Sequence, residues 1–82
     1  MSEFGWQILI SEVGDGLRRH HVTFKGERWL VHFEVEIQED AVETEARAEA
    51  ERRIRQRVEL GDVADRRIAI KRSDVETARR RH

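Results

Sequence analysis

Two histidines, His21 and His32, are the residues of this chain whose type and spacing could hold a metal ion. They lie in runs of alternating residues on either side of Gly26, and pairing these runs as a hairpin predicts that the imidazoles are cross-strand neighbours. Glu34 is the nearest candidate for a third ligand, although Arg19 is its more natural partner. Because a metal site needs three or four ligands and supporting contacts, His21 and His32 are only a weak candidate for metal binding or a metal-assisted enzyme.

A third histidine, His20, alternates with His21 and is therefore expected on the opposite, apolar face, between Ile10 and Phe33. A buried imidazole can act as a base, but the expected pairing places no serine, threonine or carboxylate beside it. We therefore interpret His20 as structural and predict no catalytic residue and no cofactor. On the other face, protonation of both His21 and His32 in mildly acidic solution would make their contact sensitive to pH.

Arginines concentrate in the second half of the chain, where a helix end, the last strand and the C-terminus could form one basic edge that contacts nucleic-acid phosphates. The candidate residues are Arg52, Arg55, Arg66, Arg67, Arg72, Arg79, Arg80 and Arg81. However, 16 Lys and Arg nearly balance 17 Asp and Glu, so no overall field attracts a polyanion. The polar face of the expected sheet, which we call the open face, also lacks stacking aromatic residues. Nucleic-acid binding is therefore the alternative hypothesis.

The polar face of the expected sheet also carries Leu9 beside His21 and Leu30 beside Thr23. This small apolar spot suits a partner contact or a dimer interface better than a pocket. We therefore predict partner binding through Leu9, His21, Leu30 and His32. The third strand is expected to be a sheet edge that is open to pairing with another chain. The main hypothesis is a small non-enzymatic interaction or regulatory domain that self-associates as a homodimer and binds an unidentified protein partner.

A two-residue turn around Gly26 is expected to position the histidines. Glycine at the first central position suits a type II′ hairpin closed by Lys25 and Arg28, because that position needs a positive φ. The expected pairs are Phe24 with Trp29, Val22 with Val31, His20 with Phe33, Thr23 with Leu30, His21 with His32, and Arg19 with Glu34.

A second turn, Gly14-Asp15-Gly16, with Gly16 in the left-handed conformation, is expected to pair Val13 with Leu17. Counting outward sets Ile10 opposite His20, Ile8 opposite Val22, and Trp6 opposite Phe24. Both hairpins then place Trp6, Phe24 and Trp29 in one buried layer. A slip of one residue in either hairpin would turn these side chains outward.

A helix is expected over residues 40–59, with Asp40 as N-cap and Gly61 at its end. Its apolar stripe is Val42, Ala46, Ala50, Ile54 and Val58, and its expected ion pairs are Glu43 with Arg47, Glu49 with Arg53, and Glu51 with Arg55. Residues 66–72, which contain Ile68 and Ile70, are expected to form a fourth strand. Ser73 to Glu76 match a capping box, which would begin a short helix.

The predicted fold is therefore α+β, in the order β-β-β-α-β. It has a four-stranded, mainly antiparallel sheet with one helix on one face. A crossover helix normally returns a parallel strand, and we favour a position beside the first strand, which gives the sheet order 4-1-2-3. Residues 1–72 are expected to form a single domain, and residues 73–82 a basic C-terminal tail or short helix. Without cysteine or an apolar run of about 18 residues, we expect a cytoplasmic protein that does not enter a membrane.

Overall fold

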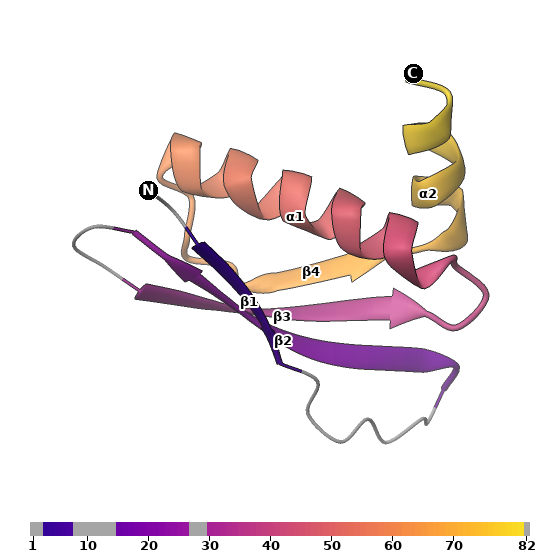
Figure 1. Cartoon of the computed structure of the whole chain (residues 1–82), viewed down its shortest axis with the longest axis horizontal. Coiled ribbons are helices and arrows are strands. Elements are labelled where there is room, and N and C mark those ends of the chain that lie inside the picture. Colours follow the sequence, from indigo (N-terminus) through magenta and orange to yellow (C-terminus); the bar gives the residue numbers. More distant parts are fainter. Residues whose placement is uncertain (1–2, 8–14, 27–29, 82) are drawn as a thin grey trace.

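The computed structural model describes residues 3–7, 15–26 and 30–81. The elements in chain order are β1 (Glu3–Gln7), β2 (Leu17–Lys25), β3 (Leu30–Gln38), α1 (Glu43–Leu60), β4 (Arg67–Ile70) and α2 (Arg72–Arg79). Helix α1 lies across one face of the sheet, and α2 stands beside the beginning of α1 (Figure 1). The predicted α+β class is confirmed, and α2 occupies most of the predicted C-terminal segment.

The sheet has the strand order β1-β2-β3-β4, in which β4 runs parallel to β3 and the other pairs are antiparallel. The predicted order 4-1-2-3 is therefore wrong. The prediction of the third strand as a sheet edge is also wrong, because β3 lies between β2 and β4. Strands β1 and β3 point the same way, so a parallel crossover strand could join either of them. The crossover rule alone therefore could not choose between the two positions.

Both hairpins differ from the predicted pairing by two residues. Trp6 pairs with Val22 rather than with Phe24, and Phe24 pairs with Val31. Lys25 pairs with Leu30, so the second connection is longer than a two-residue turn. Because side chains alternate with a period of two, this displacement leaves the described side chains of β2 and β3 on their predicted faces. The predicted positions of Ile8, Leu9, Ile10, Val13 and Trp29 lie outside the described residues.

The core lies between the sheet and α1. It consists of Val22, Phe24, Val31, Phe33, Val35, Ile37, Ala41, Ala46, Ala50, Ile54, Ile68, Ile70 and Val75, with Trp6, Val58 and Val63 partly buried against it. The small side chains of Ala46 and Ala50 let the backbone of α1 approach the sheet closely. Val42 is exposed, so the buried stripe of α1 starts one turn later than predicted.

The beginning of α1 differs from the prediction, whereas its end agrees. The helix begins at Glu43 after Val42, whose backbone is extended and supplies no side-chain cap. Asp40 is not the N-cap, because it lies in a turn in which the Ala41 N–H donates to the Gln38 carbonyl at 3.0 Å. Gly61 ends the helix with a φ of 74°, a left-handed conformation that glycine adopts without strain.

Helix α2 is capped by a carboxylate. The Lys71 N–H donates to the Asp74 carboxylate at 2.8 Å, so this cap begins two residues before the predicted Ser73. Val75 is buried in the core and anchors α2 to the domain. The predicted C-terminal segment therefore folds back onto the sheet and helix layer.

Candidate functional site

The open face of the sheet, opposite α1, carries both predicted histidines. His21 pairs with Glu34, and His32 pairs with Thr23, whose Oγ1 lies 3.1 Å from His32 Nδ1. The predicted direct pairing of His21 with His32 is therefore wrong, and the two imidazoles lie at diagonal positions of the ladder. Arg19 accordingly pairs with Glu36, at 3.8 Å, instead of with Glu34.

A hollow of about 370 Å³ lies on this face. It is lined by His21, His32, Phe33, Glu34, Ala64, Asp65, Arg66 and Arg67. Glu34 is opposite Arg67 in the β3–β4 ladder, but in the described part of the chain the guanidinium groups of Arg66 and Arg67 make no hydrogen bond or ion pair. No group of three or more metal-ligating side chains occurs among the described residues. The hollow therefore combines two imidazoles with two carboxylates and two guanidiniums, a mixture that suits a polar partner.

The rim of the hollow is held by α1. Arg57 Nη1 donates to the carbonyl oxygens of Asp65, at 2.8 Å, and Arg67, at 2.9 Å. The Asp65 carboxylate in turn accepts the Arg67 N–H at 3.1 Å. These contacts fix the segment that carries the two guanidiniums, and Arg57 Nη1 also lies 4.0 Å from the Asp65 carboxylate.

Of the predicted partner-binding residues, three lie on the open face. His21 and His32 line the hollow. Leu30 lies two residues before His32 in β3, so it is on the same face, and it is 53% exposed. Leu9 lies outside the described residues. The structure therefore brings an apolar side chain and two imidazoles to the same face.

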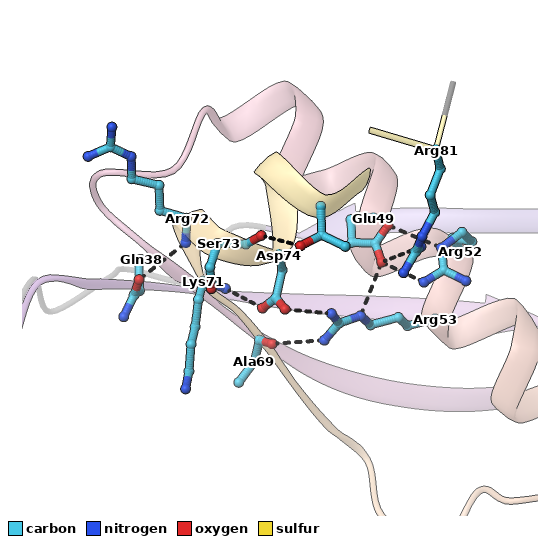
Figure 2. Close-up of polar contacts among 11 residues, drawn as sticks. Gln38, Glu49, Arg52, Arg53, Ala69, Lys71, Arg72, Ser73, Asp74 and Arg81 are labelled. Carbon is cyan, nitrogen blue, oxygen red and sulfur yellow. Dashed lines mark hydrogen bonds and ion pairs between the residues drawn. The ribbon is translucent and has the colours of Figure 1, made fainter. Parts of the chain in front are cut away.

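Two arginines of α1 and one that follows α2 converge on a buried carboxylate (Figure 2). Glu49 is only 4% exposed and accepts two hydrogen bonds from Arg52, at 2.6 and 3.1 Å. Arg53 donates to it at 3.3 Å, and Arg81 lies 3.6 Å away. The hydrogen bond from Arg52 is the main reason that the pKa of Glu49 falls below its ordinary value.

Arg53 also joins α1 to α2. Its Nη2 lies 2.9 Å from the Asp74 carboxylate. Burial alone would raise the pKa of Asp74, but the Lys71 N–H and Arg53 together hold that pKa below its ordinary value. The capping carboxylate of α2 is thus part of the same charge cluster as Glu49 (Figure 2).

The other predicted nucleic-acid contacts are mostly paired as well. Arg79 donates to Glu45, Arg72 to Glu76 at 3.1 Å, and Arg55 lies 3.9 Å from Glu51. Arg52 and Arg79 line a crevice of about 190 Å³ between α1 and α2, whereas Arg66 and Arg67 line the open-face hollow, and the two linings share no residue. Arg80 is exposed. The structure therefore divides the predicted basic edge between separate surfaces.

The three predicted ion pairs along α1 are present. They are Glu43 with Arg47 at 3.6 Å, Glu49 with Arg53 at 3.3 Å, and Glu51 with Arg55 at 3.9 Å. Spacings of three and four residues thus provide most of the helix arginines with a local partner.

His20 lies in a second polar cluster, beneath the first turn of α1. It is 2% exposed and faces α1 as predicted, although it pairs with Val35 rather than with Phe33. Its Nε2 lies 3.3 Å from Glu43 Oε1, without the geometry of a hydrogen bond, and neither ring nitrogen has a hydrogen-bond partner among the described residues. The strand pairing predicted from the sequence did not identify Glu43 as a neighbour of His20, because this carboxylate comes from α1 and not from a strand.

Three further side chains surround this pair. The Trp6 ring meets His20 edge-on with the centroids 5.9 Å apart, and the Arg47 guanidinium lies 5.3 Å from the Trp6 ring centroid. Arg18 lies 3.7 Å from Glu43. Burial lowers the pKa of His20, Arg47 and Arg18 lower it further, and Glu43 opposes them. The lowered pKa favours the neutral imidazole, which lies buried beside the first turn of α1.

Comparisons with models of known protein families, with curated proteins and with solved structures find no match for this chain. Within the described ranges, neither helix is long and apolar enough to cross a membrane.

Proposed function

We propose that the protein is a small non-enzymatic interaction domain that forms a homodimer through the open face of its sheet. The observation that carries this proposal is the hollow on that face, where Arg66 and Arg67 have no recorded partner while most other arginines in the described ranges are ion-paired. Unpaired guanidiniums keep their donors available for a second molecule.

The mixture of charges in the hollow favours a second copy of the chain as the partner. A two-fold contact brings each patch against itself, so opposite charges within one patch can meet across the axis. Glu34 and Asp65 lie in the same hollow as Arg66 and Arg67, and each copy therefore offers carboxylates to the guanidiniums of the other. The same carboxylates disfavour a polyanion, because they would oppose its phosphates.

Leu30 supplies an apolar contact beside the charged residues. Its side chain is largely exposed on the same face as His32. Complete burial of a leucine side chain stabilises by about 2 kcal/mol. A chain of 82 residues buries a smaller share of its surface than a larger domain, so burial of this face in a dimer would add to its stability.

Sedimentation velocity over a range of protein concentrations tests the dimer. We expect the mass of the wild-type protein to double with concentration, and we expect Arg67→Glu and Glu34→Arg each to weaken self-association at least tenfold. An equimolar mixture of the two variants should restore a dimer, because each variant then meets the opposite charge on its partner.

Arg80→Glu is the matched control, since it reverses one exposed arginine outside the hollow and should leave the dimer unchanged. A wild-type protein that stays monomeric at every concentration would contradict the proposal. If it stays monomeric but binds single-stranded RNA with a steep loss on added salt, and Arg67→Glu removes that binding, the nucleic-acid hypothesis would take its place.

A further inference from the structure

We infer that Arg53 and Arg57 of α1 close the outer edge of β4 against pairing with β4 of a second copy. Strand β4 is the last strand of the sheet in the described chain. A terminal strand normally exposes backbone groups on which another strand can add, and proteins commonly block such edges. Here the block is made by two side chains of the helix that precedes β4. This inference does not depend on the open-face dimer.

The hydrogen-bonding pattern of β4 shows which of its carbonyl groups point outward. The Glu34 N–H of β3 donates to the Arg66 carbonyl at 2.7 Å, and β4 continues in parallel register with β3. Carbonyls alternate in direction along a strand, so those of Arg67 and Ala69 point away from β3. These two carbonyls are the ones that an added strand would need.

Both outward carbonyls already accept a guanidinium hydrogen bond. Arg57 Nη1 donates to the Arg67 carbonyl at 2.9 Å, and Arg53 Nη1 donates to the Ala69 carbonyl at 3.2 Å. Figure 2 shows the second of these contacts, with the Arg53 guanidinium contacting both the Ala69 carbonyl and Asp74. The side chains of Arg53 and Arg57 are 31% and 30% exposed, so most of each side chain is covered by protein.

The strand that this edge would accept without the block is another β4. Its Ile68 and Ile70 are buried against α1, whereas Arg67 and Ala69 are exposed. Two copies related by a two-fold axis would pair antiparallel and exchange hydrogen bonds at the same outward groups. The arginines replace those bonds within one chain, and they also place two cations where a second strand would have to enter.

A labelled peptide with the sequence of residues 66–72, Arg-Arg-Ile-Ala-Ile-Lys-Arg, provides a direct probe. Its binding is measured by fluorescence anisotropy against the wild-type protein, Arg57→Met, and the Arg53→Met/Arg57→Met double variant. Methionine keeps an apolar stem and removes the donors. We expect at least tenfold tighter binding by the double variant than by the wild type, with the single variant between them.

Two controls separate edge pairing from charge effects. Arg55→Met removes one cation from α1 away from β4 and should bind the peptide like the wild type. A peptide with proline in place of Ala69 keeps the charges but lacks a ladder donor, so it should not bind the double variant. Arg57→Met leaves the contacts between Arg53 and Asp74 intact, and it therefore tests the inference even if the double variant fails to fold. Native circular dichroism of this variant combined with wild-type peptide binding would overturn the inference.

Discussion

The crevice between α1 and α2 and the hollow on the open face are both lined by arginine, but the guanidiniums have different surroundings. In the crevice, Glu49 accepts a hydrogen bond from Arg52 of the same helix, and Glu45 accepts one from Arg79 of α2. In the hollow, Arg66 and Arg67 have no recorded partner within the described ranges. A dense run of arginines in a sequence therefore does not by itself indicate a basic surface. In a helix, carboxylates three or four residues away can neutralise the arginines.

Replacement of Glu49 tests the first half of this contrast and should have the largest effect. Glu49→Gln leaves Arg52, Arg53 and Arg81 without their shared anion. We expect the free energy of unfolding in urea at pH 7 to fall by about 2 kcal/mol, less than for a fully buried pair because the arginines remain partly in water. Glu34→Gln, in the hollow, should change it by less than about 0.5 kcal/mol.

The pH dependence of Glu49 sharpens the same contrast. Its folded-state pKa lies below the ordinary value of 4.5, so its contribution is fully present above pH 4.5 and is lost as pH falls through the folded-state pKa. The difference in stability between the wild type and Glu49→Gln should therefore shrink in that acidic range. A constant difference would show that the ion cluster is not its source.

His20 should give an effect at a higher pH. Because its folded-state pKa lies below 6.5, the neutral ring contributes stability above pH 6.5 that is lost as pH falls from there through the folded-state pKa. We expect urea denaturation of the wild type to show a loss of stability in this window. His20→Leu should lack this loss, while Glu49→Gln should retain it.

The smallest expected effect is the difference in unfolding free energy between replacing a paired arginine and replacing an unpaired one. Arg52→Ala should destabilise the protein by about 0.5 to 1 kcal/mol, since its bidentate partner is buried although the arginine is half exposed. Arg66→Ala should stay within about 0.5 kcal/mol of the wild type, measured by the same urea titration. Equal losses for the two variants would contradict the distinction between the crevice and the hollow.

The sequence predicted which face each strand residue occupies but not which residues are opposite one another. Alternation of polar and apolar residues depends only on the period of two, so His20 was correctly placed under α1 and His32 on the open face. Opposite neighbours also depend on loop length, and the connection from Lys25 to Leu30 is longer than a tight glycine turn. The displacement by two residues separated His21 from His32 as a direct pair.

Contacts between elements were harder to predict from the sequence than contacts within a single element. The ion pair between Glu43 and Arg47 follows from a spacing of four residues, and Gly61 follows from helix-end chemistry. The approach of Glu43 to His20, and of Arg53 to Asp74, depends on how α1 lies on the sheet and where β4 joins it. Both possible positions of β4 satisfied the same chain-crossing rule, so these contacts required the three-dimensional structure.

The guanidinium of Arg53 touches groups from three elements: Glu49 in α1, the Ala69 carbonyl in β4 and Asp74 in α2. Opening α2 would leave this cation with fewer acceptors and would expose Val75 from the core. The last helix should therefore behave in native-state hydrogen exchange as part of the same cooperative unit as β4, with amides that open together and not by fraying from the C-terminus.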